Sequence, residues 1–260
     1  MSQPNSSLNP AVGKLESLPQ SIVAYGREMP KGELLPFHEH QRAQLVFASQ
    51  GVMSVTTHTA SYIVPPQRAV WMPEHVEHQI EALSDVSMRT LYIDTNLPIS
   101  LPGHACILQV SPLLRELIIT AVAQGTRYEE GTPQSRIMSV ILDQIGELPI
   151  VSLALPMPLD DRLLKITSAL IKEPANQQNL ECWAKQVGAS KRTLSRLFNA
   201  ELGMSFTEWR QQRRIHRAIE LLSAGLSVTT IAQEVGYENT SAFIAVFKRC
   251  LGTTPANYLS

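Results

Sequence analysis

A repeat in the C-terminal half constrains the fold of this 260-residue chain more than any other feature. Residues 183–209 and 231–258 match at an offset of 48 residues before an internal turn and 49 residues after it. Matching positions spread over most of both segments indicate two copies of one small structural unit. The matched pairs are Ala184 and Ala232, Gly188 and Gly236, Phe198 and Phe247, Leu202 and Leu251, Gly203 and Gly252, and Trp209 and Tyr258.

Each copy has the pattern of two helices joined by a tight turn. Gly188 and Gly236 stand where the first helix of each copy would end, and glycine ends a helix at positive φ more readily than any other residue. Ser190 and Asn239 follow as polar N-caps of a second helix that has one apolar stripe. This arrangement predicts a helix-turn-helix, whose second helix lies in the major groove of DNA.

The outward positions of the two second helices are candidate DNA contacts. Arginine can bind guanine O6 and N7 through two hydrogen bonds, while lysine, serine and threonine can hold phosphates. Because the first copy has the cations, we expect it to carry more of the base reading. The candidates are Lys191, Arg192, Ser195 and Arg196 in the first copy and Asn239, Thr240, Ser241 and Ala245 in the second.

A further helix is predicted between the copies, over residues 205–225. Its basic residues fall at the spacing i, i+3, i+4, i+7, on one face. They either contact DNA phosphates, with Arg213 as the candidate, or form a solvated face that pairs with Glu208 or Glu220; both interpretations stay open from the sequence. The arginines of this face are Arg210, Arg213, Arg214 and Arg217.

Three segments carry a resemblance to a known family: ASKRTLSRLF, ELGMSFTEWRQQRRIHRAIELL and IAQEVGYENTSAFIAVFKRCLGTTPANY. Through them, residues 160–260 resemble the DNA-binding domain of the AraC/XylS family of bacterial transcription regulators. The resemblance implies seven helices, including two helix-turn-helix units that enter adjacent major grooves. Ala245 stands where the family often has a basic or polar residue. A helical bundle that binds protein instead of DNA is the alternative. The base-reading positions that the resemblance implies are Arg192, Ser195, Arg196, Thr240, Ser241 and Ala245.

The N-terminal half has the pattern of an all-β barrel or sandwich, with short apolar runs between Gly, Pro, Asp and Ser turns. The spacing of His38, His40 and Gln44 resembles the first cupin motif, with Gln44 where glutamate is usual. The segment PEHVEHQI resembles the second, with His78 in place and His75 where glycine is usual. Cupin domains that precede this type of DNA-binding domain usually sense a small molecule.

A metal site is one interpretation of the histidines. Residues two apart on a strand point to the same side, so His38 and His40 are expected to enter the barrel, where Gln44 and His78 could meet them. Three imidazoles and one oxygen donor suit zinc, nickel, iron or copper. The alternative is an effector pocket that these polar groups line without a metal.

The enzyme alternative is a metal-dependent cupin enzyme tethered to a helical domain. The usual carboxylate ligand is missing, and Glu39 should point away from the barrel. We therefore expect no catalysis, but a transcription regulator that binds double-stranded DNA near a promoter under the control of a small-molecule effector. The three scattered cysteines and the lack of a signal segment or membrane-spanning run favour the cytoplasm.

Two helices predicted between residues 111 and 148 either cover the barrel or form a homodimer interface, and we expect a homodimer. RNA polymerase is a candidate partner, and a membrane is not. Overall the sequence predicts an α+β protein, with a cupin-like β-barrel before an all-α double helix-turn-helix domain. The predicted boundaries are 1–19 for a flexible N-terminus, 20–110 for the sensor barrel, 111–148 for the helical dimerisation segment, 149–159 for a linker and 160–260 for the DNA-binding domain.

Overall fold

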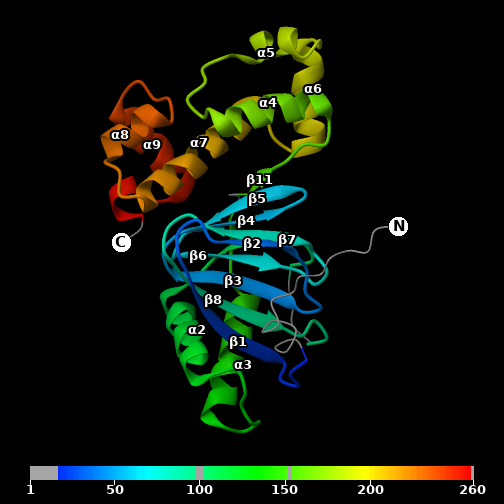
Figure 1. The fold of residues 1–260 in the computed structure, drawn as a ribbon, viewed down its shortest axis with the longest axis vertical. Coiled ribbons are helices and arrows are strands. Elements are labelled where there is room, and N and C mark those ends of the chain that lie inside the picture. Colours follow the sequence, from blue (N-terminus) through cyan, green and yellow to red (C-terminus); the bar gives the residue numbers. More distant parts are fainter. Residues whose placement is uncertain (1–16, 98–101, 152–153, 259–260) are drawn as a thin grey trace. The chain divides into compact units, whose positions relative to one another are not determined.

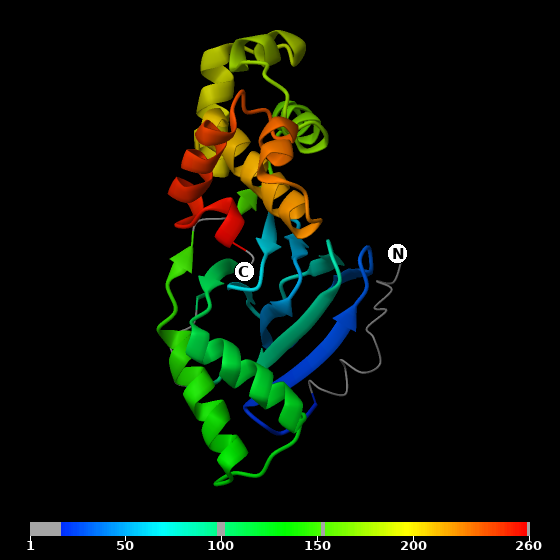
Figure 2. The same cartoon turned by 90° about the vertical axis from the view of Figure 1, so that its left-hand side faces the viewer.

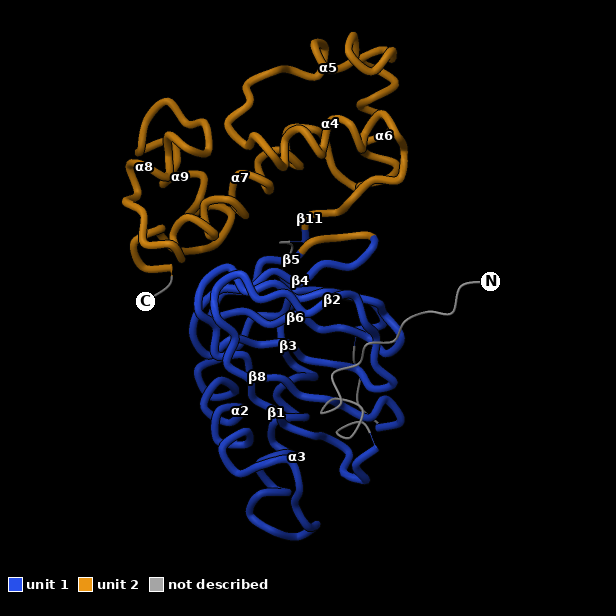
Figure 3. Tube along the Cα trace, in the orientation of Figure 1, with its two compact units in different colours: residues 1–58, 62–154 blue, residues 59–61, 155–260 orange. Residues whose placement is uncertain are grey.

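The structure is a computed structural model that describes residues 17–97, 102–151 and 154–258. The chain divides into two compact units, residues 1–58 with 62–154 and residues 59–61 with 155–260 (Figure 3). Residues 59–61 fall in the second unit because β11 (Leu155–Pro156) pairs with Ala60 and Ser61. Most of the N-terminus predicted to be flexible lies outside the described residues.

The first unit is an antiparallel β-sandwich of two sheets, which confirms the predicted all-β sensor fold (Figure 1). The six-stranded sheet has the order β1-β8-β3-β6-β9-β10. The other sheet has the order β11-β5-β4-β7-β2, in which β11 and residues 60–61 of β5 are counted with the second unit. The strands are β1 (Ile22–Met29), β2 (Leu34–His38), β3 (Ala43–Gln50), β4 (Met53–Thr57), β5 (Ala60–Val64), β6 (Arg68–Met72), β7 (His78–Ala82), β8 (Val86–Ile93), β9 (Cys106–Gln109) and β10 (Ile150–Val151).

Two helices, α2 (Pro112–Gln124) and α3 (Pro133–Gly146), cover the outer face of the six-stranded sheet (Figure 2). α2 begins at the start of the segment predicted to be helical. Ser111 precedes Pro112 and caps the helix, because its side chain accepts a hydrogen bond from the Leu114 backbone N–H. Alternate residues of the central strands pack against these helices and form the core. The other alternate set, which includes Gln44 and Thr90, faces the interior between the sheets.

The second unit holds two helix-turn-helix units, which confirms the interpretation of the repeat. Its described residues contain six α-helices and one short 3-10 helix, where the family resemblance implied seven helices. The first helix-turn-helix pairs α5 with α6, the second helix-turn-helix pairs α8 with α9, and α7 joins the two. The helices are α4 (Asp161–Lys172), α5 (Leu180–Gln186), α6 (Lys191–Leu202), α7 (Phe206–Ser223), α8 (Val228–Glu234), α9 (Thr240–Leu251) and η1 (Pro255–Asn257).

The turns of the two copies have the predicted geometry. Gly188 and Gly236 have φ values of 66° and 78°, a region that residues with a Cβ atom rarely occupy. The side chain of Ser190 accepts a hydrogen bond from Thr193 N at 3.0 Å, and Asn239 caps α9 in the same way. These local hydrogen bonds fix where each recognition helix begins.

The stretch predicted as a linker, 149–159, contains β10 and β11 among its described residues. The indole N–H of Trp209 donates to Pro156 O at 2.8 Å and so ties α7 to β11 within the second unit. Asp160 caps α4, because its carboxylate accepts from the backbone N–H of Arg162 and Leu163. The exact domain boundaries stay predictions.

Candidate functional site

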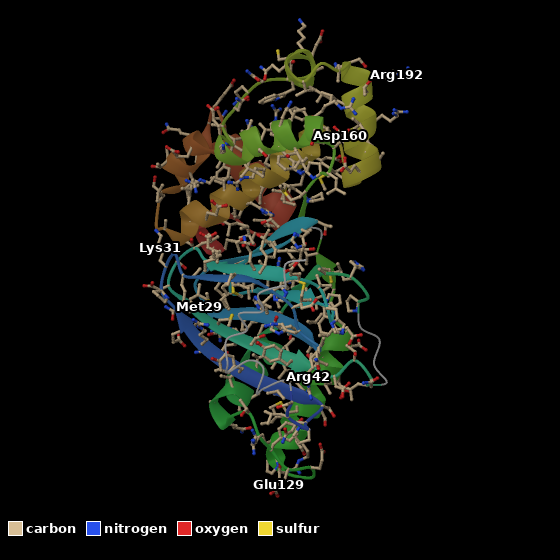
Figure 4. All side chains as sticks on the ribbon, turned by 45° about the vertical axis from the view of Figure 1, so that its right-hand side comes forward. Met29, Lys31, Arg42, Glu129, Asp160 and Arg192 are labelled. Atoms are coloured by element: carbon tan, nitrogen blue, oxygen red, sulfur yellow. The ribbon has the colours of Figure 1, made fainter. Side chains whose placement is uncertain are left out.

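The recognition helix of the first copy, α6, separates its apolar and polar side chains cleanly. Leu194 and Phe198 are fully buried, while Lys191, Arg192 and Arg196 are exposed. Figure 4 shows Arg192 on this helix. Ser195, also a predicted contact, is only half-buried. The exposed face of α6 is therefore a cationic surface on a rigid helix, which suits contacts with bases and phosphates.

The corresponding face of α9 is neutral. Ser241 and Ala245 are exposed, Thr240 is half-buried, and Asn239 uses its side-chain oxygen to cap the helix. The cations of this helix lie in its last turn, at Lys248 and Arg249, which are not among the predicted DNA contacts. Their position at the end of a predicted recognition helix could have identified them as candidates. Basic residues there also stabilise the helix by interacting with its dipole.

The arginines of α7 do not form one free cationic face. Arg213, a predicted DNA contact, is only 8% exposed. Its guanidinium donates to Glu220 Oε1 at 3.0 Å and to Ile171 O at 3.2 Å. Arg217 donates to the same Glu220 carboxylate at 2.8 Å, so the pairing with Glu220 that the sequence left open is present. The phosphate contact of Arg213 stays a prediction.

Three histidines converge in the interior of the first unit. His38 comes from the end of β2 and His78 from the start of β7, while His40 lies just beyond β2. One ring nitrogen from each histidine lies within 4.8 Å of the corresponding nitrogens of the other two. His40 and His78 are 3% and 0% exposed, so solvent does not reach these two rings, whereas His38 is half-buried. Gln44 reaches it from β3, in the opposite sheet, and is also buried.

The hydrogen bonds around Gln44 determine which of its atoms faces the histidines. The Thr90 hydroxyl has one proton, which it donates to Leu45 O at 3.1 Å. In this arrangement Thr90 Oγ1 accepts from the Gln44 side-chain NH₂ at 2.9 Å. As a result, Gln44 Oε1 faces His78 Nε2, at a distance of 3.1 Å.

His78 cannot satisfy both of its neighbours as a neutral ring. Its Nδ1 lies 2.8 Å from Val76 O and its Nε2 lies 3.1 Å from Gln44 Oε1, and both oxygens are acceptors. A neutral imidazole has only one N–H to donate. Burial, followed by the nearby His38 ring, lowers the pKa of His78 to about 4, so the doubly protonated ring is disfavoured at neutral pH. A neutral ring therefore leaves one of its nitrogens, Nδ1 or Nε2, as an acceptor that faces another acceptor.

A divalent cation would resolve this conflict, so the residues present fit a metal. With Nδ1–H donated to Val76 O, the lone pairs of His78 Nε2 and Gln44 Oε1 point at each other, and 3.1 Å suits two adjacent ligands at about 2.1 Å from one ion. Burial also lowers the pKa of His40 to about 3, which keeps that ring neutral as a ligand must be. One nitrogen atom from each of the three histidines lies within 4.8 Å of the other two, so the rings are close enough to share one ion after small side-chain movements.

The loop that follows β6 supports this cluster through its backbone. His75 has a φ of 58° and is the one non-glycine with positive φ in the described ranges. This explains why glycine is usual at that position of the motif that the segment resembles. Its N–H donates to His40 O at 2.8 Å and holds His40 in place. The His75 side chain itself is exposed.

Comparisons with known proteins support the fold of both units. One family model, described as an AraC-like ligand binding domain, matches residues 23–126, and another, described as a helix-turn-helix domain, matches residues 183–260. The HTH-type transcriptional regulator NimR of Escherichia coli (strain K12) is 34% identical over 225 residues, which is 86% of this chain and 82% of that protein. The chain belongs to the AraC/XylS family.

Other AraC/XylS relatives match smaller parts of the chain. The HTH-type transcriptional regulator RipA of Corynebacterium glutamicum is 36% identical over 103 residues, covering 40% of this chain and 31% of that protein. The arabinose operon regulatory protein of Escherichia coli is 27% identical over 159 residues, covering 60% of this chain and 53% of that protein. Across the described ranges, no helix has the length and apolar character to cross a bilayer.

The protein is therefore a DNA-binding transcription regulator with a ligand-binding domain for a small-molecule effector. The fold and the family predicted from the sequence are confirmed. The individual contact residues, the oligomeric state and the nature of the effector stay predictions.

Proposed function

We propose that this regulator acts near a promoter in the cytoplasm, binds DNA through α6 and α9, and responds to an effector held in the histidine cluster of its first unit. The observation that carries the proposal is the presence, in one chain, of two capped helix-turn-helix units and a buried three-histidine cluster. The effector shifts the population of states in which the DNA-binding unit engages its operator. Contact with RNA polymerase would then follow at the promoter.

On this proposal, the two recognition helices have unequal roles. The exposed cations of α6 read bases, while α9, with a neutral face, contributes contacts to phosphates and to the methyl groups of thymine. The proposed DNA contacts are Lys191, Arg192, Ser195, Arg196, Arg213, Asn239, Thr240, Ser241 and Ala245.

Binding-site selection from random duplexes with the full-length protein tests the DNA-binding part. Arg196→Met should then weaken binding to the selected operator by roughly 5- to 150-fold, because a good arginine–base contact is worth about 1–3 kcal/mol. Lys172→Met is a matched control, since Lys172 is an exposed cation on α4, outside the recognition helices. Equal affinities for the two variants would contradict the role of Arg196.

For the effector, we propose a divalent metal bound by His38, His40, His78 and Gln44. A bound ion would supply a fixed positive charge between the two sheets and a coordination position for a small molecule. The support is the acceptor pair formed by His78 Nε2 and Gln44 Oε1, which a cation bound between them would satisfy. Zinc, nickel, iron and copper all accept imidazole and amide ligands.

Elemental analysis of protein purified without a metal-chelating tag or chelators tests the metal. One equivalent of metal in the native protein and none in His78→Ala is the expected result. His58→Ala is the control, because His58 is an exposed histidine that pairs with Glu77 outside the cluster. Absence of metal from the native protein, even after dialysis against each of the four ions, would leave the cluster as a polar effector pocket.

We also propose a homodimer that uses α2 and α3. Each of these helices carries a large apolar side chain at its surface, Leu113 at 55% exposure and Val140 at 41%. A dimer presents two DNA-binding units to paired half-sites, which raises affinity through effective concentration. Light scattering should give twice the mass of the 28.8 kDa chain, and Leu113→Glu should shift it towards the monomer.

We propose no catalytic role for the histidine cluster. The support is that the curated relatives are named as transcriptional regulators. The metal-loaded protein should accordingly show no turnover with candidate oxygenase or isomerase substrates.

A further inference from the structure

The segment between α4 and α5, residues 173–179, leads directly into the first helix-turn-helix (Figure 1). Arginines of α7 hold its backbone. Arg214 donates from Nε to Pro174 O at 3.0 Å and from Nη2 to Asn176 O at 3.4 Å. Arg210, one turn earlier, donates to Gln178 O at 3.2 Å. The path of the chain into α5 is therefore fixed by α7.

The same segment also contacts the turn of the second helix-turn-helix. The Gln177 side chain donates to Gly236 O at 2.7 Å. A Cβ atom built on Gly236 would lie 2.8 Å from Ala175 Cα and 3.0 Å from Arg214 Nη2, so the backbones meet without room for a side chain. The two helix-turn-helix units are thus joined twice, once by α7 and once by this contact.

Arg214 lies at the centre of the second connection. Its guanidinium is 5.6 Å from the centroid of the Tyr237 ring, in the turn of the second copy, while its N–H groups bind the segment that enters the first. It is 9% exposed, and a buried cation is retained only where polar groups or an aromatic face satisfy it. Here the carbonyl oxygens and the ring do so.

A second connection changes what the two recognition helices can do. If the 18-residue helix α7 were the only link, bending of that helix would vary the distance between α6 and α9. A link on both sides closes a ring and removes that freedom. Two DNA segments can then be bound at once only if their spacing matches the fixed spacing of the helices.

We propose that Arg214 is a positioning residue that fixes the separation of α6 and α9 and so sets the spacing of the two DNA segments that the protein reads. This inference rests on the proposed function, because it requires both recognition helices to bind DNA. It assigns to Arg214 no contact with DNA.

The test uses the full-length protein and the operator obtained by selection, with the two contacted segments moved apart or together by one and two base pairs. Native protein should bind the original spacing most tightly. Arg214→Met should bind the original operator about tenfold more weakly and should discriminate less between spacings. Gln177→Ala, which removes an exposed contact and leaves the core intact, should weaken the discrimination in the same direction.

Arg217→Met is the matched control, because it removes the same charge from the same helix but from a side chain that is 40% exposed and paired with Glu220. It should retain the spacing preference of the native protein. Retention of that preference by both Arg214→Met and Gln177→Ala would overturn the positioning role and leave the proposed function intact. Spacing-independent binding by the native protein itself would overturn both.

Discussion

Replacement of Gly236 by alanine should destabilise the DNA-binding unit much more than the same change at Gly188. The two glycines occupy equivalent turns of the repeat and have similar positive φ values, 78° and 66°. The difference lies in what surrounds them. A Cβ on Gly236 would meet the backbone of Ala175 at 2.8 Å and 2.9 Å, whereas nothing lies within 4 Å of a Cβ on Gly188.

The expected losses follow from these two environments. At Gly188, alanine meets only the left-handed backbone penalty of about 1–2 kcal/mol, offset by about 0.4–1 kcal/mol through the lower entropy of the unfolded chain. The net loss is about 1 kcal/mol. At Gly236, the contact with a backbone that cannot rotate away adds about 1–3 kcal/mol of overpacking. The free energy of unfolding should therefore fall by about 2–4 kcal/mol.

Urea unfolding of the full-length protein in a Trp71→Phe background measures these losses. Trp71 belongs to the core of the first unit, so the remaining Trp183 and Trp209 report on the second. Far-UV circular dichroism, followed in parallel, checks that the helices unfold in the same transition. The m-value should stay constant if each variant changes only the stability of the folded state.

A third variant, Gly252→Ala, separates the local contact from a general sensitivity of the second copy. Gly252 lies in that copy at a φ of 82°, and nothing lies within 4 Å of its Cβ position. It should therefore behave like Gly188. Losses for Gly236→Ala and Gly188→Ala that agree within about 0.5 kcal/mol would refute the tight contact between the second turn and residues 173–179.

Three further results are expected. Gln44→Glu should tighten the binding of zinc or nickel, because a carboxylate adds negative charge to the site. Thr90→Val should weaken metal binding, because Gln44 loses the hydrogen bond that fixes its orientation. Calorimetric titration of the metal-free protein measures both effects. Asp160→Ala should lower the stability of the second unit by about 1 kcal/mol through loss of the α4 cap, while Asp160→Asn keeps most of it. Hydrogen bonds from Arg162 lower the folded pKa of Asp160 to about 2, below its usual 3.8, so the part of its stabilisation that depends on charge should be complete above pH 3.8 and lost as the pH falls towards 2. Arg192→Ala should relax base preference at one operator position without a change at the others, as repeated binding-site selection with the variant would show.

The recognition helices could be predicted almost entirely from the sequence. Their beginnings depend on a cap that binds a backbone N–H three residues later, as Ser190 and Asn239 do, and on a glycine at positive φ just before. Such signals act between near neighbours in the chain. The histidine cluster was also predictable in part. A strand spacing of two predicted that His38 and His40 would both enter the barrel, and both do lie in the cluster, although His40 follows the end of β2.

What only the tertiary structure decided is which polar side chains are engaged by distant parts of the chain. The sequence gives no reason to treat Arg214 differently from Arg210 or Arg217, since all three share one helical face. Arg214 is buried because Pro174, 40 residues earlier, and Tyr237 pack across it. Likewise, Thr90 orients Gln44 across 46 residues. Local backbone preferences fix where helices begin and end, but the partner of a buried polar group depends on long-range packing, which no short sequence pattern encodes.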